Sequence, residues 1–232
     1  MNIIKSFKNL TGFEKLLWLF SFISVIICFL FSGKGDYLNL TASLIGVTAL
    51  IFVAKGDVIG QLLSVVFAVF YGMISWQFRY YGEVATYLLM TAPIAMASVI
   101  TWLRNPYSER EVKVGKLSLK KWVLLVLSAC LVTVLFYFIL DYFDTPNIFF
   151  STLSVFTSFM ASSLTMLRSE YYGVWYGLND IVLIVLWVLA SIKDKSYLPM
   201  VACFSVFLLN DAYGFINWQR LKKKQSLNLG NK

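Results

Sequence analysis

The sequence predicts an all-α membrane protein with eight transmembrane helices. Of its 232 residues, 59% are hydrophobic and 14% are charged, whereas a soluble domain usually has about a quarter charged residues. The mean hydropathy is +0.74. The apolar residues form blocks long enough to cross a hydrocarbon core of about 30 Å, and they do not form the narrower stripe of an amphipathic helix. The lipid bilayer is therefore the expected solvent.

Eight apolar blocks are separated by charged or turn-forming segments. At a rise of about 1.5 Å per residue, each block is long enough for one membrane crossing. A longer polar segment at 105–121 separates the first four blocks from the last four and predicts a solvated loop. The predicted spans are 16–33, 37–54, 58–78, 84–103, 122–140, 145–167, 171–192 and 196–219.

The basic residues predict the orientation of these spans. If the amino terminus is cytoplasmic, sixteen of the 20 Lys and Arg fall on the cytoplasmic side, and only Lys34, Arg79, Lys193 and Lys195 fall outside. Cytoplasmic loops of membrane proteins carry an excess of Lys and Arg. The sequence therefore predicts a multi-pass protein of the bacterial plasma membrane with both termini in the cytoplasm.

An internal repeat divides the chain. An offset of 116 residues aligns the span end at 100–104 with the span end at 216–220, including Trp102 with Trp218. Four spans separate these positions, so the two copies have the same orientation, as in a parallel repeat. The predicted divisions are an extra amino-terminal helix (1–35), a first three-helix bundle (36–104), a loop and linker helix (105–143), a second bundle (144–220) and a basic cytoplasmic tail (221–232).

Several function classes are disfavoured by what the sequence lacks. It has no histidine, the commonest metal ligand and general base, and no glycine-rich phosphate-binding loop. Cys28, Cys130 and Cys203 lie in apolar blocks without metal-site spacing. The basic residues lie between the blocks, so nucleic acid is not an expected partner. We expect no metal, no cofactor and no enzymatic activity.

Two ionisable residues fall inside predicted spans. Asp180 and Asp211 lie about midway along the last two blocks, and each follows an asparagine. A charge within a membrane is costly unless it is paired or faces water, so both are candidate functional residues. Three roles are open at this point: a ligand contact, a proton relay, or the acid pair of a membrane enzyme.

Aromatic and amide side chains surround these acids at helical spacing. Tyr172, Trp175 and Asn179 recur at i, i+3 and i+7, so they share one helix face, and Asn210 and Tyr213 continue the pattern on the last span. An aromatic ring beside amides suits a planar heterocycle that bears a carboxamide or a ribose. The alternative is that the asparagines only hold neighbouring helices together.

The remaining candidates serve packing or add polar groups. Gly173 and Gly177 form a small-xxx-small pair, which predicts a closely packed neighbouring helix that would not tolerate enlargement of either glycine. In the first bundle, the corresponding helices carry polar residues without a charge. These complete the candidate substrate-binding set: Gln61, Ser64, Tyr87 and Thr91.

The paired motifs carry a family resemblance. Tyr172-x-x-Trp175-x-x-x-Asn179, followed by Leu209-Asn210-x-x-Tyr213-Gly214-x-x-x-Trp218, resembles the motifs of the PnuC-type nicotinamide riboside transporters. The resemblance implies a fold similar to the SWEET sugar transporters, with two parallel three-helix bundles and a linker helix. It also implies uptake by facilitated diffusion for NAD biosynthesis, with phosphorylation in the cell trapping the substrate. The implied ligand contacts are Trp175, Asn179, Asn210 and Tyr213.

The sequence departs from the family pattern at three places. Tyr172 replaces the first tryptophan of its motif, Ser64 stands where asparagine is often found, and the pair at 97–98 is Ala-Ser instead of Tyr-Gly. Related subfamilies carry thiamine, riboflavin or deoxynucleosides. The alternatives are therefore such a carrier or a non-transporting membrane subunit. The expected partners are a small-molecule substrate and the lipid bilayer, and assembly into a homo-oligomer is left open.

Overall fold

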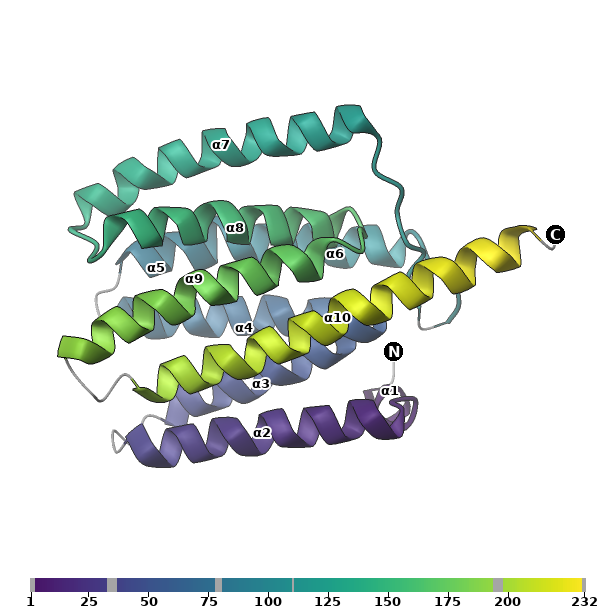
Figure 1. Cartoon of the computed structure of the whole chain (residues 1–232), viewed down its shortest axis with the longest axis horizontal. Coiled ribbons are helices and arrows are strands. Elements are labelled where there is room, and N and C mark those ends of the chain that lie inside the picture. The colour runs from purple at the N-terminus through teal and green to yellow at the C-terminus, as the bar shows by residue number, and fades with distance from the viewer. Residues whose placement is uncertain (1–2, 33–36, 78–80, 110, 194–197, 231–232) are drawn as a thin grey trace.

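The computed structural model describes residues 3–32, 37–77, 81–109, 111–193 and 198–230, and the predicted positions Lys34, Arg79 and Lys195 lie outside them. Within these ranges the chain is an all-helical bundle whose long helices run side by side (Figure 1). The helices are α1 (Ile3–Lys8), α2 (Gly12–Ser32), α3 (Tyr37–Lys55), α4 (Val58–Gln77), α5 (Tyr81–Ala85), η1 (Thr86–Thr91), α6 (Ala92–Leu103), α7 (Leu119–Tyr142), α8 (Ile148–Met166), α9 (Tyr172–Lys193) and α10 (Leu198–Gly230).

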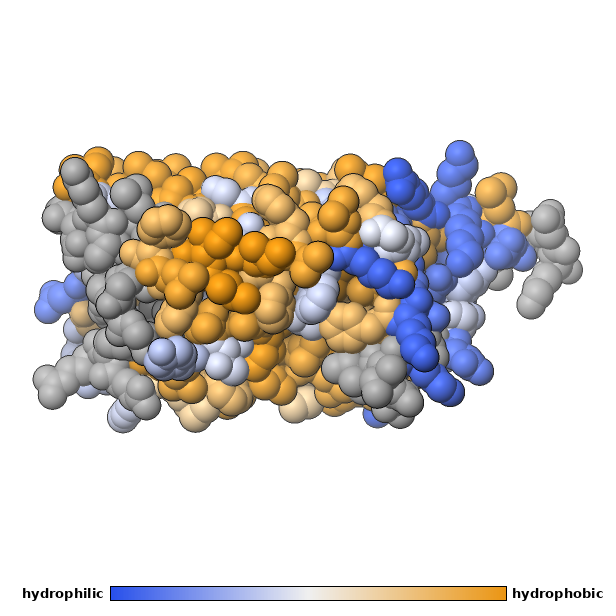
Figure 2. Space-filling view, turned by 90° about the horizontal axis from the view of Figure 1, so that it is seen from below, coloured by the Kyte–Doolittle hydropathy of each residue, from blue (hydrophilic) through white to orange (hydrophobic). Residues whose placement is uncertain are grey.

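The surface has the apolar band of a membrane protein. Figure 2 shows hydrophobic side chains over the middle of the molecule and strongly hydrophilic ones gathered toward the end where Figure 1 places both termini. Among the described residues, six helical stretches are long and apolar enough to cross a membrane, and 40–55 and 58–74 are apolar but shorter. A multi-pass membrane protein is therefore confirmed, and crossing by α3 and α4 stays a prediction.

The predicted span 84–103 is not one regular helix. Its first part contains the π-helical turn η1, in which the amide of Ala92 donates to the carbonyl of Tyr87, five residues back. The Thr91 hydroxyl donates to the Thr86 carbonyl at 3.1 Å. Pro93 follows at once, and its ring lacks an amide hydrogen and crowds the preceding turn. A widened turn before the proline accommodates this crowding.

Helix α10 does not end at residue 219. It continues as helix to Gly230, where the sequence predicted a basic tail. Gln225 is buried and ties this extension to the polar segment before α7: its Nε2 donates to the Val112 carbonyl at 3.0 Å, and its Oε1 accepts from the Val114 amide at 2.9 Å. The predicted solvated loop is therefore partly packed, because its apolar residues find a partner in α10.

One pair of contacts occurs twice. The indole of Trp102 on α6 donates to the carbonyl of Thr165 at the end of α8, at 2.9 Å. The indole of Trp218 on α10 donates to the carbonyl of Val53 near the end of α3, also at 2.9 Å. The two indole rings lie 5.4 Å apart, between centroids. The two tryptophans predicted to be equivalent therefore each donate a hydrogen bond to a helix in the other half of the chain.

The neighbouring residues repeat the same pattern. The Thr101 hydroxyl donates to the Met166 carbonyl at 2.9 Å, and the Asn217 amide donates to the Ala54 carbonyl at 2.9 Å. The donors are 116 residues apart, as the sequence alignment has them, but the acceptors are 112 residues apart. A single offset therefore does not describe the whole repeat.

Helix α2 lies on the opposite side of the bundle from α7 and packs against α3 and α10 (Figure 1). It begins with a reciprocal cap: the Thr11 amide donates to Glu14 Oε2 at 2.7 Å, and the Glu14 amide donates to the Thr11 hydroxyl at 3.2 Å. The buried Glu14 carboxylate also accepts from Lys55 Nζ at 3.0 Å and from the Tyr213 hydroxyl at 2.8 Å. One carboxylate thus joins α2 to both α3 and α10.

Helices α9 and α10 approach closely at one glycine. A Cβ atom on Gly173 would lie 2.7 Å from the carbonyl oxygen of Asp211 and 2.8 Å from the backbone nitrogen of Phe215. A Cβ atom on Gly177 would lie 3.4 Å from Cδ1 of Leu208, which is an ordinary contact with a flexible side chain. The expectation that both glycines are essential is therefore wrong for Gly177.

We expect Gly173→Ala to destabilise the protein and Gly177→Ala to leave its stability unchanged. The first change presses a methyl group against the backbone of α10, and overpacking of this kind costs about 1–3 kcal/mol. Thermal unfolding of the two purified variants in the same detergent measures the difference. Equal unfolding temperatures for both variants would show that the two helices separate freely at Gly173.

Candidate functional site

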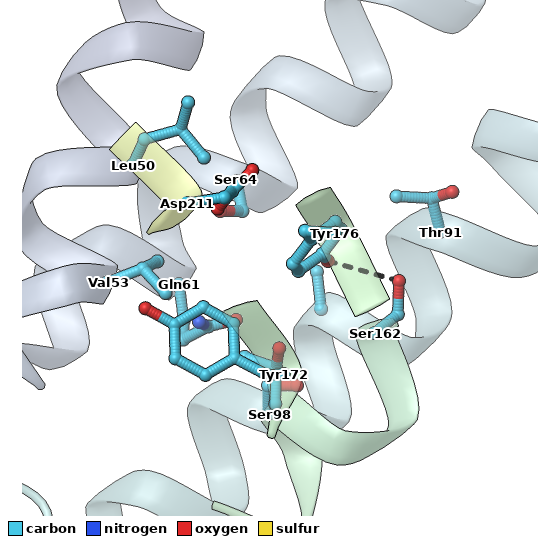
Figure 3. Close-up of a pocket in the computed structure, with 12 residues that line it drawn as sticks. Leu50, Val53, Gln61, Ser64, Thr91, Ser98, Ser162, Tyr172, Tyr176 and Asp211 are labelled. Atoms are coloured by element: carbon cyan, nitrogen blue, oxygen red, sulfur yellow. Dashed lines mark hydrogen bonds between the residues drawn. The ribbon is translucent and has the colours of Figure 1, made fainter. Parts of the chain in front are cut away.

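A small cavity lies among the helices that carry most of the predicted polar residues. Its volume is about 50 Å³, and α3, α4, η1, α6, α8, α9 and α10 each contribute to its lining (Figure 3). By contrast, α2 and α7 contribute no lining residue. The lining residues are Leu50, Val53, Gln61, Ser64, Thr91, Ala95, Ser98, Ser162, Thr165, Tyr172, Tyr176 and Asp211.

Two tyrosines of α9 form one wall of the cavity. Tyr172 and Tyr176 are one helical turn apart and therefore lie on the same face of α9. The Tyr176 hydroxyl and the Ser162 hydroxyl are 3.1 Å apart (Figure 3). Tyr172 is fully buried, and a Cβ atom on Gly214 would lie only 2.4 Å from its hydroxyl oxygen. The glycine of the second motif therefore leaves the space that the Tyr172 hydroxyl occupies.

The other walls of the cavity carry polar side chains. The hydroxyls of Ser64, Ser98 and Thr91 each donate to a carbonyl of their own helix, at 2.9, 2.8 and 3.1 Å. Gln61 is also buried, and it lines the cavity from α4. An amide has two donor hydrogens and an acceptor oxygen. The side chain of Gln61 therefore has the donors and the acceptor needed to bind a polar ligand group.

The structure brings five of the eleven predicted site residues to this cavity. They come from both halves of the chain, and each of the proposed bundles contributes some of them. Their meeting at one place supports the sequence-based choice of residues, and their contact with a substrate stays a prediction. The five are Gln61, Ser64, Thr91, Tyr172 and Asp211.

Three other predicted residues pack elsewhere. Trp175 lies edge-on to Phe156, with ring centroids 5.8 Å apart. Asn179 is buried, and its Oδ1 accepts from the Thr157 hydroxyl at 2.8 Å. Tyr87 packs against Tyr71 at a centroid distance of 4.5 Å. None of the three lines the cavity in this conformation.

Asn210 and Tyr213 face α2 rather than the cavity. The Asn210 amide donates to the Ser21 hydroxyl at 2.8 Å, and its Oδ1 is buried without a hydrogen-bond partner in the described part of the chain. The Tyr213 hydroxyl donates to Glu14, as described above. The extra helix therefore holds two side chains of the second motif. Sequence spacing gave no sign of this contact.

The last predicted residue, Asp180, is buried one turn beyond Tyr176 on the same face of α9. Its carboxyl group lies near the carboxyl group of Asp211 on α10. Within the described ranges, no group of three or more His, Cys, Asp or Glu residues is arranged to hold a metal ion. The arrangement is that of a binding cavity with aromatic, amide and carboxyl groups.

Sequence reasoning missed Tyr176 and the α8 residues Ser162 and Thr165. The signal for Tyr176 was present, because it lies four residues after Tyr172 and four before Asp180. The face at i, i+3 and i+7 was chosen instead. For Ser162 and Thr165 no signal was present, since hydroxyl residues are common in membrane helices and satisfy their own backbone.

Comparisons with known proteins agree over nearly the whole chain. Residues 36–220 match the family model described as nicotinamide mononucleotide transporter. The nicotinamide riboside transporter PnuC of Neisseria mucosa is 28% identical over 227 residues, covering 95% of this chain and 86% of the relative. That of Haemophilus influenzae is 26% identical, covering 90% and 91%. A crystal structure of the vitamin B3 transporter PnuC matches with a TM-score of 0.79 and 26% identity, covering 94% of both chains.

Proposed function

The chain belongs to the nicotinamide mononucleotide transporter family, and from this premise we propose that it carries nicotinamide riboside into the cell by facilitated diffusion. The resemblance predicted from the paired motifs is thereby confirmed at the level of the family. Because the relatives are transporters, the alternative of a membrane enzyme with an Asp180–Asp211 acid pair loses its support.

The charge of the cavity favours the riboside over the mononucleotide. Its lining includes the carboxyl group of Asp211 and no Lys or Arg. A phosphate group is normally held by Arg, Lys or a cluster of backbone amides. A phosphorylated substrate would place a buried anion beside Asp211 without a partner. Nicotinamide riboside has no phosphate, and its N-ribosylated pyridine ring is positively charged.

The contacts that occur twice support a parallel repeat. In the proposed architecture, α3, α4 and α5–α6 form the first bundle, α8, α9 and α10 form the second, α7 is the linker and α2 is the extra helix. The hydrophilic end with both termini is placed in the cytoplasm. A cavity of about 50 Å³ is much smaller than the 300–1,000 Å³ typical of small-molecule pockets. The two bundles therefore have to move apart to admit the substrate.

Net uptake by a passive carrier needs a step that removes the substrate. Phosphorylation by a cytoplasmic kinase would supply that step, because the product carries a phosphate for which the cavity has no basic partner. The sequence has no nucleotide-binding loop with which to drive transport directly. The proposed cycle therefore separates movement across the membrane from trapping.

Flux into proteoliposomes tests this function. We expect labelled nicotinamide riboside to equilibrate across the membrane without ATP or an ion gradient. Excess unlabelled riboside should abolish the uptake of label, and nicotinamide mononucleotide should compete at least tenfold less well, because its phosphate has no partner in the cavity. Competition by thiamine, riboflavin or deoxyadenosine that exceeds competition by the riboside would instead assign the protein to a related vitamin or nucleoside carrier.

A further inference from the structure

Two carboxyl groups are buried within the membrane-spanning part of the bundle. Asp180 on α9 and Asp211 on α10 are each 4% exposed. Asp211 lines the cavity, and the carboxyl group of Asp180 lies near that of Asp211. One oxygen of the pair, Oδ2 of Asp180, is buried without any hydrogen-bond partner in the described ranges. The pair is therefore incompletely satisfied by the protein.

No basic side chain of the described protein is paired with them. The three ion pairs among the described residues join other acids to Lys55, the last residue of α3, and to Lys222 and Lys224 in the last part of α10. The sequence has no Lys or Arg between residues 173 and 192 or between 198 and 219. A carboxylate in such surroundings is costly unless a positive charge accompanies it. A positive charge from outside the chain, either a proton or a cationic ligand, would balance them.

The surroundings of the pair also suit a cation with an aromatic ring. Tyr172 and Tyr176 line the same cavity as Asp211 (Figure 3). The face of a tyrosine ring attracts a cation placed over it, most strongly where water is excluded. Two rings and two carboxyl groups thus offer negative potential from several directions. Serine, threonine and aliphatic side chains, which carry no charge, make up most of the remaining lining.

We propose that Asp180 and Asp211 form a cation subsite that makes the protein select substrates with a positively charged ring over uncharged substrates of the same shape. The inference rests on the proposed function, because it takes the cavity as the transport site. Asp211 contacts the charged ring. Asp180 lies outside the cavity lining and adds its negative charge to that of Asp211. Selection is thus by charge as well as by shape.

Two ligands of nearly equal shape separate charge from shape. Nicotinamide riboside is cationic, whereas its 1,4-dihydro form is neutral. Binding of both to purified protein is measured for the wild type, Asp211→Asn and Asp180→Asn, with Asp141→Asn on the exposed end of α7 as the control. We expect Asp211→Asn to weaken binding of the cation by tenfold or more and to change binding of the neutral form less than threefold. Asp180→Asn should show a smaller effect in the same direction, and the control none.

Several outcomes would overturn the proposal. Equal losses for both ligands would mean that the acids only position the helices, and unchanged cation binding would mean that they do not face the substrate. Uptake that depends on a proton gradient in the wild type and loses this dependence in Asp211→Asn would mean that the pair carries protons. The proposed function fails separately, if the wild type neither binds nor equilibrates nicotinamide riboside. A wild type that transports the riboside, with variants that keep its charge preference, removes only the cation subsite.

Discussion

Replacing Glu14 by alanine is expected to destabilise the protein by about 3–5 kcal/mol, the usual cost of removing one partner from a buried ion pair. The Glu14 carboxylate is 1% exposed, and it accepts hydrogen bonds from Lys55, Tyr213 and the Thr11 amide. Removing it leaves a lysine charge and a tyrosine hydroxyl without a partner and also removes one of the two hydrogen bonds of the reciprocal cap of α2. Thermal unfolding in detergent should show a large fall in the midpoint.

Glu111→Ala is the matched control. Glu111 also pairs with a lysine at 3.0 Å, but its partner Lys224 is 54% exposed. Exposed ion pairs contribute about 0–1 kcal/mol, so this variant should unfold almost as the wild type does. If the two variants are equally stable, the network around Glu14 does not hold α2 to α3 and α10.

The second large effect is expected for Gly214→Ala. The new methyl carbon would lie 2.4 Å from the hydroxyl oxygen of Tyr172, and the buried ring has to shift to remove the clash. Tyr172 forms a wall of the cavity, so the shift changes the shape of the binding site. Overpacking costs about 1–3 kcal/mol, so we expect affinity for nicotinamide riboside to fall by about tenfold or more.

A second substitution separates the clash from other effects of the alanine. In Gly214→Ala with Tyr172→Phe, the hydroxyl is gone, and the nearest ring carbon lies 3.3 Å from the methyl position. The double variant should recover most of the affinity relative to Gly214→Ala, with Tyr172→Phe alone as the reference. If affinity does not recover, the alanine acts through the backbone of α10 and not through a clash with the Tyr172 hydroxyl.

The sequence predicted the bounds of several long helices well, because block length in a membrane protein follows from the thickness of the bilayer. Helix α3 runs from Tyr37 to Lys55 where 37–54 was predicted, and α8 and α9 agree similarly. The π-helical turn was not predicted, although Pro93 marks its place. Hydropathy averages over a span and does not register one additional residue in a turn. The helical continuation of α10 was missed because its partner, at Val112, lies in another segment.

The candidate site was predicted in part, and the reason is geometric. Spacing tells which side chains share a helix face, but not which helix that face meets. Asn210 and Tyr213 share a face, yet the face meets α2 through Ser21 and Glu14 instead of the cavity. Tyr172 was found because it shares the helical spacing of Trp175 and Asn179, and Asp211 because an acid within a membrane span is unusual. The repeat also changes its offset along the chain, which an alignment without gaps does not show.

The continuation of α10 to Gly230 matters for imaging the molecule. A helical membrane bundle of 26.5 kDa offers little contrast or shape for aligning single particles by electron microscopy. Helix α10 has 33 residues, or about 50 Å at 1.5 Å per residue, against a hydrocarbon core of about 30 Å. It therefore extends well beyond the lipid, and Gln225 anchors the extension. A rigid protein could be fused so that its first helix continues α10 without a break. Its position in the images would then show how the bundle is oriented.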